Sequence, residues 1–186
     1  MNEAWVGAPE RKFARLGDAV QVTDGTVIAG YASLFGTRDQ GGDVVAAGAY
    51  GRSLARLAER GGAVKMLWQH DPREPIGVWD EVREDARGLF VKGRILTDVA
   101  RGREAAALIA AGAIDGLSIG YRTVRATKDA GGVRRLDEVE LWEVSLVTFP
   151  MLAEARVASK AADTAEALLR GLAGALREAG RGLRTV

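Results

Sequence analysis

The 186-residue chain contains no cysteine and a single histidine, His70. Without cysteine it can form no disulfide, use no thiol nucleophile and build no cysteine-ligated zinc site. With one histidine, any imidazole chemistry must run through His70. These two absences leave the chain few ways to activate a nucleophile.

A surplus of charge and a long apolar run are missing as well. The formal net charge is +1, so the chain lacks the basic surplus that binding to phosphate groups usually needs. No apolar stretch is long enough to span a bilayer, and no apolar run follows a basic N-terminal start. We therefore expect a cytoplasmic protein with neither nucleic acid nor a membrane as a partner.

Length and composition fit one domain with tails. With 186 residues, of which 47% are hydrophobic, the chain can build a core of ordinary size. We expect an N-terminal arm over residues 1–20, a central domain over 21–155 and a C-terminal part over 156–186. Small side chains dominate 153–163, which predicts a mobile linker, and leucines at helical spacing predict an amphipathic helix over 164–180.

Apolar periodicity predicts an α+β domain in which strands alternate with short helices. The expected strands cover residues 26–36, 63–70, 76–85, 88–97, 117–124 and 134–149, and the expected helices cover 48–60 and 98–112. Asp98 is expected to cap the second helix. Asp71-Pro72 is expected to end the strand over 63–70, because proline cannot donate to a ladder.

Ser118 is a candidate nucleophile within "GAIDGLSIGY" (112–121). Period two along the expected strand places Ser118 on the face opposite Leu117 and Ile119, so its side chain should point away from the core. A serine hydroxyl becomes a useful nucleophile only when a base takes its proton and a third group orients that base. Taken alone, Ser118 is better explained as a small polar residue at a strand start.

His70 is open to two interpretations. It shares its phase with Met66 and Trp68, which favours a packed, hydrogen-bonded core histidine. It is also the last residue before Asp71-Pro72, where a side chain can leave the core for a surface cleft. This pattern alone does not choose between the two.

Glu143 lies within "LWEVSLVTF" (141–149), among apolar residues. An unpaired carboxylate is costly to bury, so Glu143 either faces solvent on an edge strand or has a specific hydrogen-bond partner. The apolar phase of this strand also slips between Leu141 and Val144. The slip predicts a bulge or bend near Trp142-Glu143.

His70, Ser118 and Glu143 stand, in this order, within a wider set of motifs. The set consists of "GYASLFGTRDQGGDVVAAGAYGRSL" (30–54), "VKMLWQHDPREPIGVW" (64–79), "GLSIGYR" (116–122) and "LWEVSLVTFP" (141–150). Together they resemble the prohead maturation proteases of tailed phages and gene transfer agents. That family is similar to the herpesvirus assemblins, so the resemblance implies an α+β fold with a closed antiparallel β-barrel ringed by helices.

The same resemblance implies a serine endopeptidase with Ser118 as nucleophile and His70 as base. Glu143 would orient His70, at the position where assemblins have a second histidine. The implied substrates are the N-terminal segment of the major capsid protein or an internal scaffold, together with the protease itself. The implied location is the assembling prohead in the host cell. No cofactor or metal ion is implied, and a homo-oligomer is compatible with the resemblance.

Two other functions fit the residues. A catalytically silent capsid-assembly or scaffold protein would keep the fold and dock through its C-terminal helix. A hydrolase of small esters would share the serine and histidine but would need a preformed apolar pocket. For the protease, we expect self-cleavage within or near 153–163, because this stretch can enter a cleft in extended form.

Overall fold

The computed structural model describes residues 10–13, 20–23, 25–129, 131–149 and 157–158. The strands are β1 (Glu10–Phe13), β2 (Val20–Thr23), β3 (Val27–Leu34), β4 (Val44–Val45), β5 (Lys65–Trp68), β6 (Asp71–Glu84), β7 (Gly88–Ile95), β8 (Gly116–Lys128), β9 (Arg134–Val147) and β10 (Val157–Ala158). The helices are α1 (Gly51–Glu59) and α2 (Ala100–Ala110). The domain is therefore mostly sheet with two short helices.

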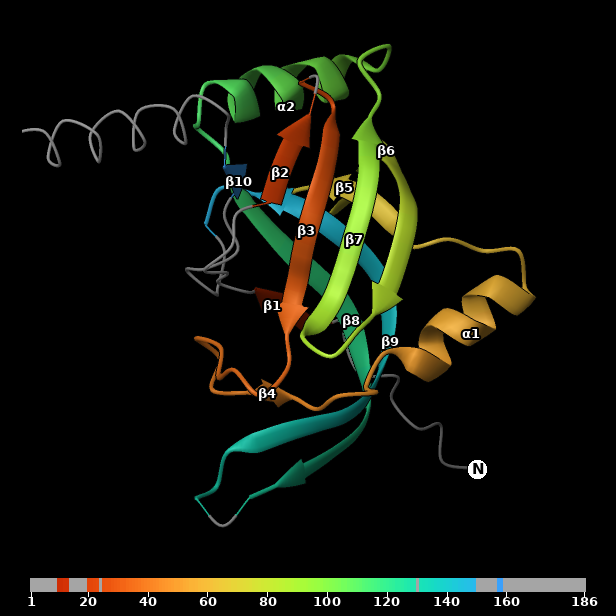
Figure 1. Cartoon of the computed structure of the whole chain (residues 1–186), viewed down its shortest axis with the longest axis vertical. Coiled ribbons are helices and arrows are strands. Elements are labelled where there is room, and N and C mark those ends of the chain that lie inside the picture. Colours follow the sequence, from red (N-terminus) through yellow and green to blue (C-terminus); the bar gives the residue numbers. More distant parts are fainter. Residues whose placement is uncertain (1–9, 14–19, 24, 130, 150–156, 159–186) are drawn as a thin grey trace, which may run out of the picture.

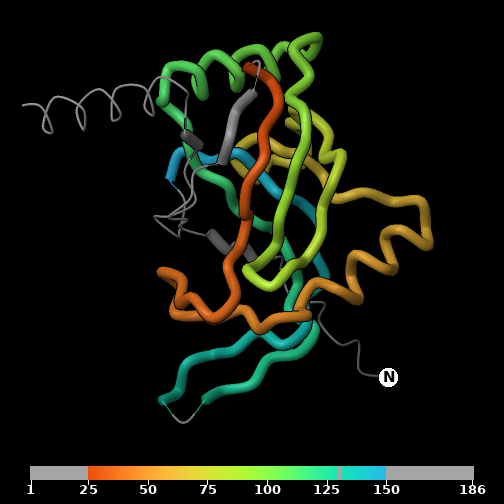
Figure 2. Tube along the Cα trace, viewed as in Figure 1, coloured from red at the N-terminus to blue at the C-terminus, as the bar shows by residue number. Residues whose placement is uncertain are grey.

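All ten strands belong to one sheet, which curls into a half-barrel (Figure 1). The pairing order is β1-β8-β9-β5-β6-β7-β3-β2-β10, with β4 added alongside β9. The Cα trace shows how the curl brings β3 and β7 in front of β8 and β9 (Figure 2). Within the described ranges the two end strands, β1 and β10, do not pair with each other, so a closed barrel stays a prediction.

The sheet is mixed, and the expectation of a purely antiparallel one is wrong. Strands β4 and β5 both run parallel to β9. The two strands line successive parts of β9, and α1 connects them in the chain. The pairing of β5 with β9 places Trp68, the last residue of β5, opposite Leu146. The turn that follows β5 therefore lies beside the end of β9.

The two helices pack on the sheet through apolar side chains. Leu54 and Leu57 of α1 lie against the apolar core. Ala105 and Ile109 of α2 are buried. Tyr50, directly before α1, is fully buried, and burial raises the pKa of its hydroxyl. In Figure 1, α2 lies across one end of the half-barrel and α1 projects from its side.

The beginning of α2 differs from the expectation. The N-cap is Val99, in extended conformation, and it makes no side-chain cap. Asp98 instead contributes its backbone carbonyl, which accepts from the Arg103 guanidinium at 3.3 Å. The Asp98 cap is therefore wrong by one position, whereas Gly112 ends the helical segment with the expected positive φ, +70°.

Parts of both expected tails belong to the sheet. Strand β1 lies in the expected N-terminal arm, and β10 lies in the expected linker, where Val157 pairs with Val20. The amphipathic helix expected over 164–180 lies outside the described residues. The domain boundaries at 20 and 155 stay predictions. Neither helix in the described ranges is long and apolar enough to cross a membrane.

Candidate active site

Ser118 lies on β8 with its side chain directed away from the core, as the alternation predicts. Its neighbours Leu117 and Ile119 belong to the core cluster on the other face. Ser118 is nevertheless 0% exposed. Across the β8–β9 ladder it faces Ser145. The fold therefore holds this hydroxyl among polar groups in a site closed to solvent.

His70 lies in a tight turn between β5 and β6. Trp68 pairs with Asp71, so Gln69 and His70 are the two central residues of the turn, and their φ angles are +50° and +64°. Two-residue hairpins favour positive φ at both central positions. Asn and Gly are the usual residues there, because other side chains adopt this conformation at a cost.

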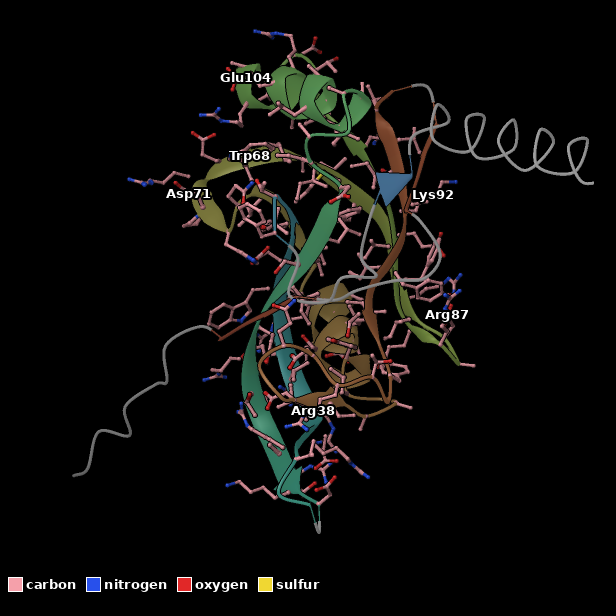
Figure 3. The ribbon with its side chains drawn as sticks, turned by 90° about the vertical axis from the view of Figure 1, so that its left-hand side faces the viewer. Arg38, Trp68, Asp71, Arg87, Lys92 and Glu104 are labelled. Atoms are coloured by element: carbon pink, nitrogen blue, oxygen red, sulfur yellow. The ribbon has the colours of Figure 1, made fainter. Side chains whose placement is uncertain are left out.

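Backbone and side-chain bonds hold this turn in place. The Gln69 N–H donates to the Leu146 carbonyl at 2.9 Å, and the Gln69 side-chain amide donates to the Thr148 hydroxyl at 2.7 Å. Trp68 and Asp71, on either side of the turn, lie below α2 in Figure 3. Asp71-Pro72 is therefore not where the first of the two strands ends. The turn at Gln69-His70 ends it, and Asp71 already belongs to β6.

The structure brings the three candidate residues into one hydrogen-bonded chain. Ser118 Oγ lies 2.6 Å from His70 Nε2, and His70 Nδ1 lies 2.5 Å from Glu143 Oε1. An ionised carboxylate can only accept, so the Nδ1–H group donates to Glu143 and Nε2 accepts from the serine hydroxyl. His70 is 7% exposed and Glu143 is 8% exposed. This geometry fits the transfer of a proton from Ser118 to His70.

Glu143 owes its position to a bulge in β9. Gly120 of β8 pairs with Glu143 and the next residue, Tyr121, pairs with Leu141, so Trp142 is the extra residue. The bulge expected near Trp142-Glu143 is confirmed. It lets Leu141 face the core while Glu143 joins Ser118 on the other face.

Two further residues position the Glu143 carboxylate. The Ser145 hydroxyl, itself 0% exposed, donates to Glu143 Oε2. Gly120 leaves the space that the carboxylate fills, because a Cβ added there would lie 2.0 Å from Glu143 Oε1. Both carboxylate oxygens are thus held in place, which agrees with the rule that a buried charge needs partners.

Ser145 and Gly120 are site residues that carry no expected role from the sequence. The available signal was their spacing: Ser145 follows Glu143 by two residues, and Gly120 follows Ser118 by two. Residues two apart share a face of a strand. The pairing of Gly120 with Glu143 depends on the β8–β9 register, and the sequence alone does not give that register.

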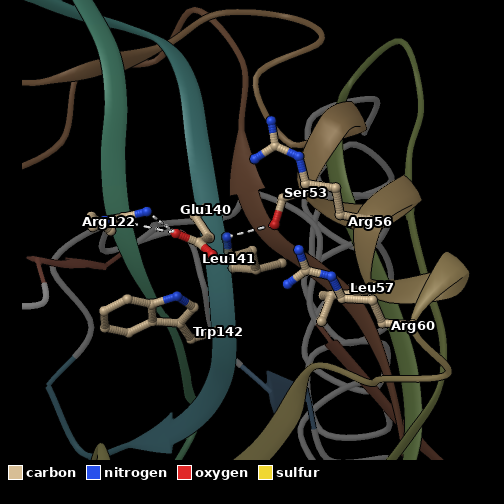
Figure 4. Close-up of a pocket in the computed structure, with 8 residues that line it drawn as sticks. All are labelled: Ser53, Arg56, Leu57, Arg60, Arg122, Glu140, Leu141 and Trp142. Atoms are coloured by element: carbon tan, nitrogen blue, oxygen red, sulfur yellow. Dashed lines mark hydrogen bonds and ion pairs between the residues drawn. The ribbon is translucent and has the colours of Figure 1, made fainter.

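A pocket of about 300 Å³ opens next to the bulge (Figure 4). Its wall is formed by residues of α1 and its C-cap, of β8 and of β9: Ser53, Arg56, Leu57, Arg60, Arg122, Glu140, Leu141 and Trp142. The Arg122 guanidinium donates to Glu140 through Nε at 3.0 Å and through Nη2 at 2.5 Å. None of Ser118, His70 and Glu143 lines this pocket, which is cationic and partly aromatic. Within the described ranges, no group of three or more His, Asp or Glu side chains could hold a metal ion.

Comparisons with known proteins agree on one family. The model of the family described as caudovirus prohead serine protease matches residues 17–169. The chain is 29% identical over 136 residues to the prohead protease of Enterobacteria phage HK97, which covers 72% of this chain. The same alignment covers 59% of that relative, so the chain matches less than two-thirds of its length.

A solved structure shares the fold. The capsid assembly protease of bacteriophage T4 is similar with a TM-score of 0.58 and 17% sequence identity. The match covers 77% of this chain and 100% of that chain. The curled sheet with two helices is therefore the fold of a phage capsid protease.

Proposed function

Because the chain belongs to the family of caudovirus prohead serine proteases, we propose that it is an endopeptidase with Ser118, His70 and Glu143 as its catalytic triad. The observation that carries the proposal is the continuous chain of two hydrogen bonds, 2.6 and 2.5 Å, through the only imidazole of the protein. A carboxylate in the third position suits this chemistry, because it stabilises the imidazolium that forms when His70 takes the serine proton.

In the proposed reaction, Ser118 Oγ attacks the carbonyl carbon of the scissile peptide bond while its proton passes to His70 Nε2. The tetrahedral intermediate collapses as the C–N bond breaks, and His70 returns the proton to the leaving amine. A water molecule, activated by His70 in the same way, hydrolyses the acyl-enzyme and releases Ser118. Ser145 and Gly120 take no part in these steps and act as positioning residues for Glu143.

The substrate is proposed from the names of the similar proteins. Those proteins are called a prohead protease and a capsid assembly protease. We infer that the substrates here are the N-terminal segment of the major capsid protein or an internal scaffold, and the chain itself. The site of action would then be the assembling prohead in the host cell. We further propose that the curled sheet is a barrel of the herpesvirus-protease type.

Co-expression with the major capsid protein proposed as its substrate tests this function. Intact-mass measurement should find a shortened capsid protein with the wild type and the full-length one with Ser118→Ala. Equal shortening with both would contradict the proposal.

A fluorophosphonate probe separates the enzyme from the alternatives. A covalent adduct on the Ser118 peptide, absent in His70→Ala, supports the proposed site. No adduct and no capsid cleavage would favour a catalytically silent assembly protein. An adduct with turnover of small esters, but without capsid cleavage, would favour an esterase.

A further inference from the structure

Strand β8, which carries Ser118, has two edges with different neighbours. Along one edge it pairs with β9 from Gly116 to Lys128. Along the other, within the described ranges, its only partner is the four-residue strand β1. Proteins commonly bind an extended peptide by adding it as a strand to such an edge, where main-chain hydrogen bonds supply much of the affinity. The second edge of β8 is therefore the place where a peptide could pair beside the nucleophile.

Strand β1 already lies at this edge. It runs antiparallel to β8, with Glu10 opposite Tyr121 and Phe13 opposite Ser118. In Figure 1, β1 lies alongside β8 at the end of the sheet. A segment of the chain itself thus takes the position and the extended conformation of a peptide passing the nucleophile.

The burial of Ser118 indicates that this arrangement is a resting state. A hydroxyl that is 0% exposed cannot meet the carbonyl carbon of an incoming peptide. Some part of the site must therefore move before the reaction. Short strands at the end of a sheet open at a lower free energy than strands paired on both sides. By this criterion β1 is the part that leaves, because β9 is paired with β8 on one side and β5 on the other.

We propose that the β8 edge from Ser118 to Tyr121 is a strand-addition site for the peptide substrate and that β1 occupies it as an intramolecular competitor. The proposal rests on the proposed protease function and deepens it. The substrate is received as an extended segment, antiparallel to β8, after β1 has left. The register assigns Phe13 to the position beside the nucleophile that a substrate residue then takes.

A pair of double variants tests the proposal on the full chain. In an antiparallel ladder, neighbouring residues alternate in directing their N–H groups toward the partner strand. Arg11→Pro with Lys12→Pro therefore removes at least one possible donor toward β8. Arg11→Ala with Lys12→Ala is the matched control, because it removes the same side chains and keeps both N–H groups.

The rate of fluorophosphonate labelling of Ser118 is the first measurement. We expect the double-proline variant to react at least tenfold faster than the wild type, and the double-alanine variant to stay within about twofold of it. Similar rates for all three folded proteins would overturn the proposal while leaving the protease function intact. Absence of labelling in all three would instead contradict the protease function.

A second measurement does not depend on how the proline variant folds. A synthetic peptide of residues 7–18, "GAPERKFARLGD", is added to the full-length wild type, with a scrambled peptide as control. We expect the native peptide alone to slow Ser118 labelling in a saturable manner, or to be cut itself. The peptides are tested up to several millimolar, because tethered β1 competes at an effective concentration of about that order. Equal behaviour of the two peptides over this range would show that the segment has no affinity for the β8 edge.

Discussion

The two halves of the β8–β9 hairpin are built from the same pair of strands but differ in the burial and the hydrogen bonding of their polar side chains. The inner half joins Gly116–Gly120 to Glu143–Val147, and the outer half joins Tyr121–Lys128 to Arg134–Leu141. Polar side chains of the inner half are buried in one connected network around Ser118 and Glu143. The outer half projects from the sheet (Figure 1), and its polar groups form small local clusters, such as Asp137 with its partners Thr127 and Arg135.

The difference predicts how each half responds to substitution. A buried network leaves an unsatisfied group behind when one member is removed, and this costs much more than the bond itself contributed. An exposed pair is replaced by water at little cost. The bulge at Trp142 is the boundary between the halves, so substitutions on its two sides should give sharply different results.

The largest effect is expected at the proposed nucleophile and base. Ser118→Ala and His70→Ala should each lower kcat/KM for capsid-protein cleavage by about 10⁴-fold or more, since members of a triad act as a unit. The measurement is a cleavage time course, with circular dichroism to show that the fold is kept. Cleavage by His70→Ala at the wild-type rate would contradict the mechanism.

The next effect is expected at Glu143. Glu143→Gln keeps the size of the side chain but removes the charge that stabilises the His70 imidazolium. We expect kcat to fall by about 10²- to 10⁴-fold, and KM to change little. Activity equal to that of the wild type would mean that the short bond to His70 Nδ1 has no role in the reaction.

Gly120→Ala tests the space beside the carboxylate. The new Cβ would meet Glu143 Oε1 at 2.0 Å, so the carboxylate has to move away from His70. We expect kcat to fall by roughly 10²-fold, because small displacements in an active site have effects of this size. Gly131→Ala is the control: its Cβ would lie 3.3 Å from the exposed Asp129 carboxylate, and activity should be kept.

The two glycine variants should also differ in a readout other than rate. A displaced carboxylate changes the Nδ1–H resonance of the single histidine in the NMR spectrum of Gly120→Ala but not of Gly131→Ala. Equal spectra and equal rates for the two variants would exclude a positioning role for Gly120.

Ser145→Ala should have a smaller effect. It removes the hydroxyl that donates to Glu143 Oε2 and leaves that oxygen without this donor. A hydrogen bond to a charged group corresponds to roughly tenfold in rate, which is the loss that we expect in kcat. Ser145→Thr, which restores a hydroxyl, should recover part of the rate; equal rates for both variants would mean that the hydroxyl is not what matters.

The smallest effect is expected in the outer half. Hydrogen bonds from Arg135 and Thr127 lower the pKa of Asp137 below its ordinary value. In Arg135→Ala this pKa should rise toward that value, as an NMR titration would show, while kcat/KM stays within about twofold of the wild type.

The lowered pKa of Asp137 also makes the stability of the fold depend on pH. A carboxyl group whose pKa is lower in the folded than in the unfolded state stabilises the fold at pH values above the unfolded-state pKa. This contribution is lost as the pH falls through the lower, folded-state pKa. The free energies of unfolding of the wild type and Arg135→Ala should therefore differ most near neutral pH and become equal in acid. A difference in free energy that grows as the pH falls would contradict the assignment of the shift to Arg135.

The sequence predicts those features of the site that depend on local spacing. The alternation of apolar and polar residues predicts which face of the strand carries Ser118, and the slip in that alternation predicts the bulge at Trp142. The spacing of glycines and apolar residues predicts the two helices. The parallel pairing of β5 with β9 is not local, and it decides that His70 comes to lie beside Glu143. From the sequence, only the resemblance to a family groups His70, Ser118 and Glu143 into one site.

Other features escaped prediction because local rules favour a different result. Turn statistics favour asparagine and glycine at two positions of positive φ, so Gln69-His70 does not read as a tight turn. A short polar segment such as Glu10–Phe13 has no apolar pattern that would predict its pairing with β8. In both cases contacts from distant parts of the chain override the local preference.

The turn at Gln69 and His70 also limits how far this domain can be stabilised without harm. Left-handed backbone at a non-glycine residue costs on the order of 1 kcal/mol, so Gln69→Gly would relieve part of that cost. The same change would remove the amide that bonds Thr148 and loosen the support of the only imidazole. Selection for thermal stability would thus favour Gln69→Gly, whereas selection for a high rate would reject it. Stability and turnover compete here at one side chain that supports His70 from the neighbouring position in the turn.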